Sequence, residues 1–532
     1  MGSLIDEIAD SREAVSPWPS PRELADPGEA DPMKTVVFIP FDQLDRRRGA
    51  LREACPATHE ILMIESDDLL GARAWHAQRL FFIMSAAAHF REDLEVEGFT
   101  VHLMHSPSIA AGLAEFRAEH PGRSILAAQG SSHAQQRLFE SAGIDVVPND
   151  FFLTSREEFT GWAGGRATLL METFYRWQRQ RLGILLDDRG EPVGGQWNFD
   201  ADNRLPPPKG HHPWPAALEH PADATDDRVW SLLKERELSL VGSAPDGTWA
   251  TTRAGALEQL EHFLETGFAE FGAYEDAMPS DSWSVNHSLL SPYLNIGLLH
   301  PSEVVNAAIK RFERGGIPIS SCEGFIRQLI GWREYINGVY WFFGDGYRGL
   351  NNLAADRPLL PLFEDSSRTL MNCVATTVRD LEARAWVHHI PRLMVLSNLA
   401  LLTGVNPGEF LGWMRRMFID AADWVMVPNV IGMGVHADGG QMMTKPYAAG
   451  GAYISRMGNY CGGCTFNPKL RTGPTACPFT TLYWDFLDRN RPAFDRNHRM
   501  AQQVRGLDRL SDLPELRERA QEVLAGLSDG AI

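Results

Sequence analysis

Four of the six cysteines, all in the second half of the chain, have a spacing typical of metal ligands. They are Cys373, Cys461, Cys464 and Cys477. Cys461 and Cys464 form a C-x2-C pair, so one tight turn can present both sulfur atoms, and the two intervening glycines let the backbone approach closely. Four thiolates suit tetrahedral zinc or an iron–sulfur cluster, and the chemistry alone slightly favours zinc. The alternative is four unrelated buried thiols. Cys55 and Cys322 are isolated, and we expect both in the core.

The composition is that of a globular protein with enough residues for two domains. The chain has 532 residues, of which 44% are hydrophobic and 22% charged. No apolar run is as long as a membrane span, the first residues lack a signal pattern, and six cysteines do not suggest a secreted disulfide scaffold. We therefore expect a cytoplasmic protein. The net charge of −19 argues against nucleic acid as a partner, but residues 455–505 carry a basic excess that is compatible with a local basic face.

Apolar runs and helical periodicities divide the chain into unlike halves. Short apolar runs that predict strands occur at 35–39, 60–64, 100–104, 124–128 and 145–147, and a helical pattern covers 74–97. This alternation predicts a parallel sheet wrapped by helices. Later in the chain, helical periodicity dominates, as at 256–271 and 374–402. The expected units are an acidic leader without fixed structure at 1–32, an α/β domain at 33–165, a connector at 166–250, a helical domain at 251–491 and a helical tail at 492–532.

Several separate motifs in the helical half resemble photolyases and cryptochromes. They are HSLLSPYL at 287–294, QLIGWREY at 328–335, HHIPRLM at 388–394, TKPY at 444–447 and YISRMGNYC at 453–461. The last two resemble one branch, the bacterial iron–sulfur cryptochrome/photolyase group with the prokaryotic (6-4) photolyases. The resemblance implies a Rossmann-like α/β antenna domain followed by an all-helical domain that binds FAD. It also implies that the cysteine quartet holds a [4Fe–4S] cluster instead of zinc.

The resemblance further implies which residues hold FAD. They are His287, Ser288, Leu290, Ser291, Gln328, Arg333, Arg392, Asp420, Asp423 and Asn429. We expect Ser288 and Ser291 to bind the diphosphate at the start of a helix, although either serine is also an ordinary helix cap. Asp420, Asp423 and Asn429 are the candidates for partners of the flavin ring edge. Arg392 is expected to balance a carboxylate beside the ring.

The implied activity is light-driven repair of (6-4) photoproducts in UV-damaged DNA by a monomer. Repair requires an electron from reduced flavin and a proton for the lesion, and histidine suits the second task because its pKa lies near neutrality. By its position in the HH-x-x-R motif, His389 is the expected proton donor and His388 its support. A hydrogen-bonded core pair is the alternative, and Pro391 favours a helix that begins here.

An aromatic pocket for the flipped lesion is also expected, with Trp332, Tyr335 and Trp341 as candidates, although aromatic residues at this spacing are more often simple core. Two other functions remain open. One is a blue-light photoreceptor with the same cofactors and no repair, and the other is a light-independent DNA- or RNA-binding module with a structural metal.

Three positions depart from the family pattern. The antenna in this branch is a lumazine (6,7-dimethyl-8-ribityllumazine), held partly by a carboxylate in the second strand–helix loop. Leu69 stands at that position and argues against antenna binding, although Asp42 and Glu65 are carboxylates nearby. Trp413, expected to pass electrons to the flavin, is retained. A second family tryptophan is replaced by the pair at 364–365, and Met414 replaces an aromatic residue. We therefore expect the relay through Trp413 to be interrupted, with Trp424 and Tyr460 as the available substitutes.

Overall fold

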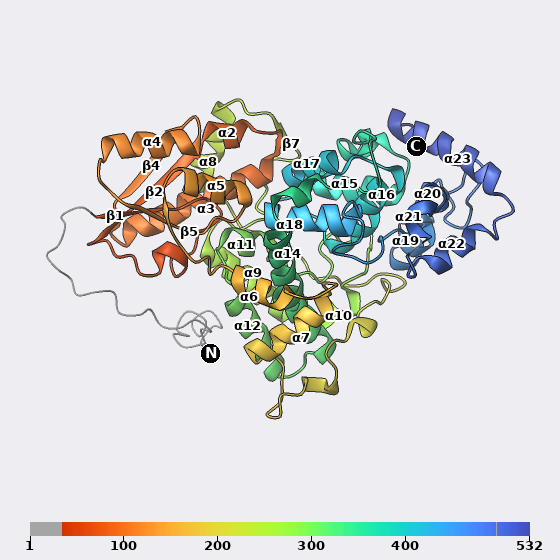
Figure 1. Cartoon of the computed structure of the whole chain (residues 1–532), viewed down its shortest axis with the longest axis horizontal. Coiled ribbons are helices and arrows are strands. Elements are labelled where there is room, and N and C mark those ends of the chain that lie inside the picture. Colours follow the sequence, from red (N-terminus) through yellow and green to blue (C-terminus); the bar gives the residue numbers. More distant parts are fainter. Residues whose placement is uncertain (1–33, 496) are drawn as a thin grey trace.

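The computed structural model describes residues 34–495 and 497–532 (Figure 1). The predicted leader at 1–32 lies outside the described residues. Figure 1 shows an α/β lobe, in red and orange, beside a larger helical part that runs through green to blue. None of the described helices is long and apolar enough to span a membrane.

The α/β lobe is built on a sheet of five parallel strands in the order β4-β2-β1-β5-β6. The strands are β1 (Thr35–Phe38), β2 (His59–Ser66), β4 (Val101–Ser106), β5 (Ile125–Ala128) and β6 (Asp145–Val147). Each coincides with one of the predicted apolar runs, which confirms the parallel sheet. Its helices are α2 (Asp67–Gly71), α3 (Ala77–Val96), α4 (Ile109–Glu119) and α5 (His133–Ser141).

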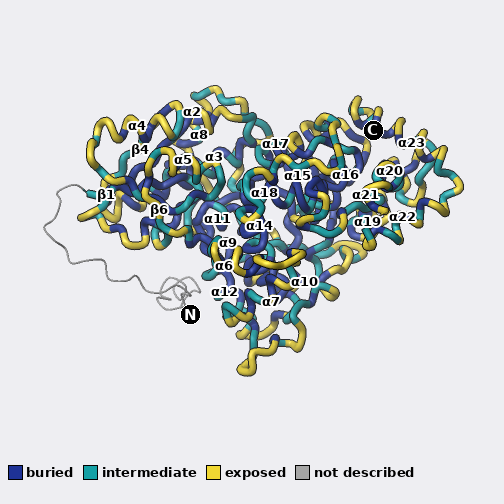
Figure 2. The backbone as a smooth tube through the Cα atoms, viewed as in Figure 1, coloured by how far each residue is buried: buried dark blue, intermediate teal, exposed yellow. Residues whose placement is uncertain are grey.

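Both faces of this sheet are covered by helices. Val37 and Ile61 point to one face and belong to the same core as Phe82 of α3. Their neighbours Val36 and Leu62 point to the other face, where the core includes helices α4 and α5. Strands buried on both sides read as continuous apolar runs, which explains why the sequence revealed them so clearly. In Figure 2 the buried segments of this lobe lie in its interior and the exposed segments lie along its outer edge.

The segment between the sheet and the helical part is more ordered than the irregular connector suggested by the sequence. It contains α6 (Arg156–Ala163), α7 (Met171–Leu182), α8 (Ala224–Glu235) and β7 (Leu240–Val241). Strand β7 pairs in parallel with β3 (Trp75–His76). Helix α8 packs on α3, whereas α7 packs on the helical part.

The helical part has no strand element after β7 within the described residues. Its helices up to the histidine motif are α9 (Arg253–Thr266), α10 (Phe268–Tyr274), α11 (Ser291–Ile296), α12 (Pro301–Glu313), α13 (Ile319–Ile326), α14 (Glu334–Phe343) and α15 (Asn372–Arg384). The later helices are α16 (Asn398–Thr403), α17 (Pro407–Met417), α18 (Asp423–Val427), α19 (Gly451–Met457), α20 (Pro478–Arg489), α21 (Arg491–Phe494), α22 (Ala501–Leu507) and α23 (Leu513–Asp529). Helix α23 packs on α20 through buried Leu516, Val523 and Leu527.

Two of the long helical patterns are interrupted. The pattern at 256–271 divides at Gly267 into α9 and α10. The pattern at 374–402 ends at Ala385, whose left-handed φ of 56° terminates α15, and helical structure resumes at His389. Pro391 therefore lies in the first turn of a new helix, as the sequence predicted.

Three π-helical segments carry predicted site residues. They are η4 (Arg327–Arg333), η8 (Pro391–Ser397) and η9 (Pro428–Gly434). Gln328 and Arg333 lie on η4, Arg392 on η8 and Asn429 on η9. Widened turns of this kind are rare in proteins overall, but those that occur are often at functional sites. The place where these three segments meet is therefore a candidate active site.

Candidate active site

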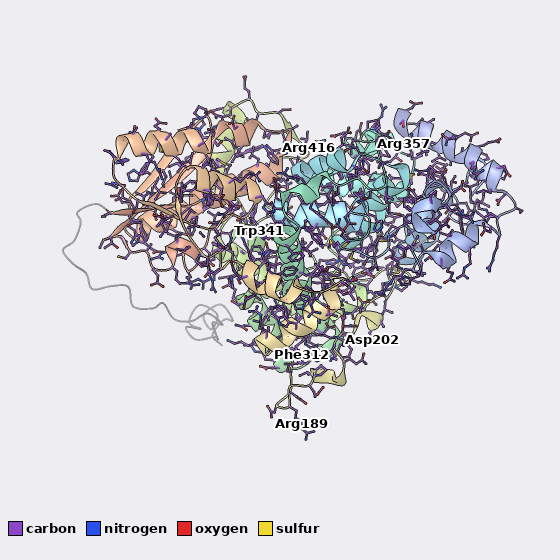
Figure 3. The ribbon with its side chains drawn as sticks, in the orientation of Figure 1. Arg189, Asp202, Phe312, Trp341, Arg357 and Arg416 are labelled. Carbon is purple, nitrogen blue, oxygen red and sulfur yellow. The ribbon has the colours of Figure 1, made fainter. Side chains whose placement is uncertain are left out.

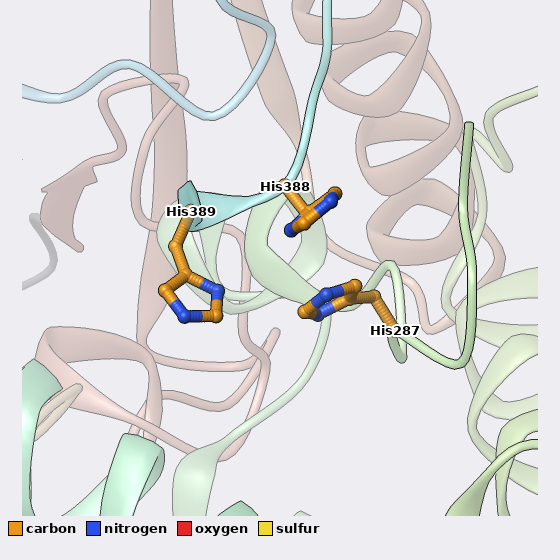
Figure 4. Close-up of side chains that lie close together, drawn as sticks. All are labelled: His287, His388 and His389. Carbon is orange, nitrogen blue, oxygen red and sulfur yellow. The ribbon is translucent and has the colours of Figure 1, made fainter. Parts of the chain in front are cut away.

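Three histidines from two distant segments form a cluster (Figure 4). His287 comes from the loop before α11, and His388 and His389 follow the end of α15. The rings of His287 and His388 are stacked, with centroids 4.4 Å apart, and the ring of His389 lies edge-on to His287 at 5.5 Å. One ring nitrogen from each histidine lies within 4.8 Å of the others. The break after Ala385 creates this arrangement, because it turns the histidine pair toward His287.

The three histidines differ in their surroundings. Burial lowers the pKa of both His287 and His388 well below the usual value, so both rings are neutral near pH 7. His389 is 48% exposed, and its Nε2 lies 3.4 Å from Oδ1 of Asp276. A protonated His389 would therefore have a carboxylate counter-charge and access to solvent. This residue has the surroundings that a proton donor needs.

The burial of His388 predicts a pH-dependent stability. Below about pH 6.5 the unfolded chain gains a proton at His388, whereas the folded site does not, because its pKa is depressed. The free energy of unfolding should then decrease by about 1.4 kcal/mol per pH unit as the pH falls, until the folded pKa is reached. We expect the thermal midpoint of His388→Gln to fall less than that of wild type between about pH 7.5 and about pH 5.5. Exposed His105→Gln is the control, and an equal fall in wild type and His388→Gln would contradict the prediction.

The carboxylate partner of Arg392 is Asp420. Both terminal nitrogens of Arg392 donate to the two carboxylate oxygens at 2.9 Å each, and its Nε donates to the carbonyl of Val387 at 2.6 Å. The hydroxyl of Ser291 donates to Oδ2 of Asp420 at 2.6 Å. A bidentate arginine–carboxylate pair is strong and directional. It joins helix α11, segment η8 and the loop before α18 at one point.

An arginine of the α/β lobe holds the backbone around Asp420. Arg79 of α3 is buried and donates to the carbonyl oxygens of Phe418, Ile419 and Ala421 at 2.9, 2.9 and 2.7 Å. Burial lowers the pKa of Arg79 to about 10. The two halves of the molecule therefore meet directly behind the Arg392–Asp420 pair.

The remaining candidate ligands have other partners. Asp423 pairs with Arg348 at 3.0 Å and with Arg415 at 2.6 Å, separately from Arg392. The guanidinium of Arg333 lies between the rings of Phe152 and Trp424 at 4.5 and 4.6 Å.

Arg333 also connects to the Asp420 group through Asn295. It donates to Oδ1 of Asn295, whose amide nitrogen donates to the carbonyl of Asp420. Gln328 and Asn429 bond to backbone carbonyls one turn away, at Gly324 and Val425. Ser288 accepts a bond at its carbonyl from Gln259, and Leu290 is buried at the start of α11.

The four cysteines predicted as ligands line one cavity. Cys373 lies on α15, Cys461 on the turn at Tyr460–Gly463 (η10), Cys464 directly after that turn, and Cys477 directly before α20. Gly451 closes the cavity from α19, since a Cβ atom there would lie 2.8 Å from Sγ of Cys477. Cys322 is buried as expected, but Cys55 is exposed, so its assignment to the core was wrong. Cys55 lies in the loop before β2, outside the sheet.

The aromatic residues expected around the lesion are dispersed. Tyr335 is buried in a core cluster with Phe159 and Phe174, so its assignment to a pocket was wrong. Trp341 lies near the centre of the molecule in Figure 3, with the guanidinium of Arg156 over its ring at 3.4 Å. The ring of Trp332 lies 6.2 Å from that of Tyr335. The packing of α14 and η4 against α6 and α7 determines where these three aromatic rings lie. The sequence motif gave no indication of this packing.

The predicted antenna carboxylates are separated. Glu65 lines a cavity of about 90 Å³ between the sheet, α3 and α8. Nη2 of Arg236 donates to Oε2 of Glu65 at 2.6 Å. Asp42 is bonded to Gln135 away from this cavity, and burial raises its pKa. Leu69 is 56% exposed on α2. Of the two remaining carboxylates, only Glu65 is therefore placed to contact a ligand in the cavity.

Three mutually adjacent tryptophans and Asp276 were not identified from the sequence. The tryptophans are Trp249, Trp283 and Trp386. They come from separate segments, so no spacing pattern connects them. Trp386 stands two residues before the histidine pair, which is the one signal that could have indicated it.

Comparisons with known proteins agree with this arrangement. A model of the family described as deoxyribodipyrimidine photo-lyase-related protein matches residues 37–249. A (6-4) photolyase of Agrobacterium fabrum is 39% identical over 496 residues, covering 90% of this chain and 96% of that relative. A bacterial class III photolyase structure from Agrobacterium tumefaciens matches with a TM-score of 0.55 and 18% identity, covering 94% of this chain and 99% of that chain. A Synechocystis cryptochrome structure matches with a TM-score of 0.51 and 16% identity, covering 76% and 83% of the two chains. Because the identity to the first relative extends over almost its whole length, the chain belongs to the photolyase/cryptochrome family, in the group of the bacterial (6-4) photolyases.

Proposed function

We propose that the protein is a (6-4) photolyase that binds UV-damaged DNA and repairs (6-4) photoproducts under blue light, with FAD as its cofactor. The observation that carries the proposal is the histidine cluster. His388 is buried and His287 is partly buried, both with lowered pKa values and therefore neutral, and the third, His389, is half exposed beside Asp276. A photoreceptor has no need for a solvent-accessible proton donor at this place. Loss of the lesion under blue light, measured with FAD-loaded protein and a synthetic (6-4) oligonucleotide, tests the proposal.

The polar groups around the histidine cluster fit a flavin. Nε2 of His287, Nδ1 of His388 and both amide atoms of Asn286 are buried without a protein partner in the structure. Buried polar atoms normally have hydrogen-bond partners, so this group indicates a polar ligand. Arg392 and Asp420 would stand beside the ring, and Ser288 and Ser291 beside the diphosphate. When bound, FAD supplies light absorption and one-electron transfer.

The residues of the chain then hold and move the proton. His389 would carry it toward the lesion from the exposed side, and the carboxylate of Asp276, 3.4 Å from Nε2 of His389, would orient the ring. His388, kept neutral by burial, would hold the ring of His287 by stacking without competing for the proton.

The side chains near Asp276 also suit nucleic acid. Burial raises the pKa of Tyr453 to about 12, the charge of Asp276 raises it further, and the charges of Arg456 and Arg204 lower it. The guanidinium of Arg456 lies 5.4 Å from the ring of Tyr453. Arginines neutralise phosphates and aromatic rings stack on bases, so the local chemistry supports DNA binding despite the net charge of −19.

The cysteine cavity supports a [4Fe–4S] cluster better than zinc. A tetrahedral zinc site with Zn–S bonds of about 2.3 Å brings its sulfur atoms to ~3.8 Å from one another. Among the described residues, no three cysteine sulfurs lie within 4.8 Å of one another. The wider spacing suits a larger metal centre, with Cys373, Cys461, Cys464 and Cys477 as its ligands. We also propose Glu65 and Arg236 as polar contacts for an antenna molecule of the lumazine type, if one binds in the cavity beside β2.

The Arg392–Asp420 pair yields a prediction about flavin retention. Asp420→Asn removes one charge of a mostly buried pair and should weaken FAD binding by roughly 10²-fold, equivalent to about 3 kcal/mol. The ratio of flavin to protein absorbance after gel filtration measures the effect. Asp423→Asn is the matched control, because this carboxylate pairs with Arg348 and Arg415 instead. Loss of FAD in the control alone would place the flavin ring at Asp423.

A further inference from the structure

Three tryptophans lie in mutual contact beside the proposed flavin site. Ring centroids are 5.7 Å apart for Trp283 and Trp386, 6.3 Å for Trp249 and Trp386, and 6.4 Å for Trp249 and Trp283. Trp249 precedes α9, Trp283 follows α10, and Trp386 follows α15. Indole is among the most easily oxidised side chains, so three indoles in contact can pass an electron from one to the next.

The inner end of this group is Trp386. It is 5% exposed, and its Nε1 lies 3.4 Å from the hydroxyl of Ser291. The guanidinium of Arg392 lies 5.7 Å from its ring, and the ring of His287 lies edge-on at 6.2 Å. Trp386 is therefore in contact with the residues that we propose to hold FAD.

The outer end of the group is Trp283, because it is only partly buried. Trp249, in contrast, is buried, with 6% of its surface exposed. The guanidinium of Arg384 lies 4.9 Å from the ring of Trp283, and the backbone carbonyl of Arg384 accepts from Nε1 of Trp249. A cation over the ring disfavours a positive charge on Trp283. An oxidised Trp283 must therefore lose its N–H proton to water or be reduced quickly, and its partial exposure permits both.

The relay residues considered from the sequence, Trp413, Trp424 and Tyr460, contact no second tryptophan or tyrosine ring among the described residues. The rings in contact with Trp413, among the described residues, are all phenylalanines, namely Phe363, Phe410 and Phe418. Phenylalanine is far harder to oxidise than tryptophan or tyrosine. Trp424 contacts Phe152 and Arg333, and Tyr460 lines the cysteine cavity.

We propose that Trp386, Trp249 and Trp283 form the electron relay by which oxidised FAD in this protein is photoreduced, an inference that rests on the proposed function because it requires FAD at the Ser291–Arg392 site. With FAD bound, Trp386 would give one electron to the photoexcited flavin. Trp283 refills Trp386, directly or by way of Trp249, and an external thiol refills Trp283, losing one electron and its proton. In sum the flavin gains one electron, the thiol is oxidised, and the tryptophans return to their initial state.

The test is photoreduction of FAD-loaded protein under blue light with dithiothreitol, followed by the loss of the oxidised-flavin band. We expect Trp386→Phe and Trp283→Phe to lose most of this photoreduction, whereas Trp413→Phe and Trp424→Phe keep it. Trp283→Phe keeps the test informative if Trp386→Phe fails to fold, because Trp283 is only partly buried and its replacement should disturb folding less. Illumination in air without thiol should add oxygen to Trp283 in wild type but not in Trp386→Phe, as measured by peptide mass spectrometry.

A parallel repair assay separates the relay from the proposed function. FAD reduced beforehand with dithionite needs no relay, so Trp283→Phe should then repair as well as wild type. Unchanged photoreduction in both relay variants, or its loss in Trp413→Phe, overturns the relay and leaves the repair proposal intact. Slowed photoreduction in the relay variants, with no repair by pre-reduced wild type, supports the relay and overturns the repair proposal.

Discussion

His389→Ala is expected to lower repair of (6-4) photoproducts by about 10²-fold or more, while the protein keeps its FAD. General acid catalysis by a positioned side chain contributes about this factor, and the alanine side chain cannot deliver a proton. FAD is retained because His389 is half exposed and its partner is Asp276, whereas the polar atoms that indicate the flavin site belong to His287, His388 and Asn286. Repair rates with pre-reduced flavin and the flavin content of the same preparations are measured together.

Asp276→Asn is the companion variant for this prediction. It removes the carboxylate that lies 3.4 Å from Nε2 of His389 and holds this ring in place, and it should give a repair rate between those of wild type and His389→Ala. His262→Ala, which removes a histidine bonded to the carbonyl of Ala216, is the control. Wild-type repair by His389→Ala would exclude this residue as the proton donor. Wild-type protein that binds FAD but leaves every lesion unchanged would favour the photoreceptor, and repair of cyclobutane dimers instead would correct the substrate.

The α/β lobe could be predicted from the sequence because its signals are local. A strand buried on both faces, such as β2, is a continuous apolar run wherever it pairs. The convergence of Cys373 with Cys461, Cys464 and Cys477 was also predicted, although only the later three are close in sequence. Cys55 was misplaced because a lone cysteine carries no periodic signal.

The candidate site depended on contacts that no local pattern reveals. Apolar periodicity continues through 374–402, yet the chain breaks at Ala385, where its carbonyl accepts from the backbone of Ile419. The sequence offered two carboxylates as partners of Arg392, and the choice of Asp420 follows from packing against Arg79 of the other lobe. The tryptophan group was missed for the same reason, because its members meet only after α9, α10 and α15 have packed.

The cysteine site gives the second large effect. We expect about four irons per chain after anaerobic purification, and loss of both the iron and most of the soluble protein in Cys461→Ser or Cys464→Ser. The four cysteines connect α15, the turn before Cys464 and the start of α20 around one cavity. Binding of the metal centre therefore also contributes free energy to folding, and removing one ligand leaves thiols facing an unfilled space.

Cys55→Ser and Cys322→Ala are the matched controls for the ligand variants. Cys55 is exposed and Cys322 is buried, and neither lines the cavity, so both variants should keep the wild-type iron content. Elemental analysis for iron and zinc, together with visible absorption, measures the result. A second, independent readout is the yield of soluble protein for each variant under the same expression conditions. One zinc per chain in place of iron would show that the wide spacing of the sulfur atoms had been misinterpreted, and that these thiolates close around a single ion.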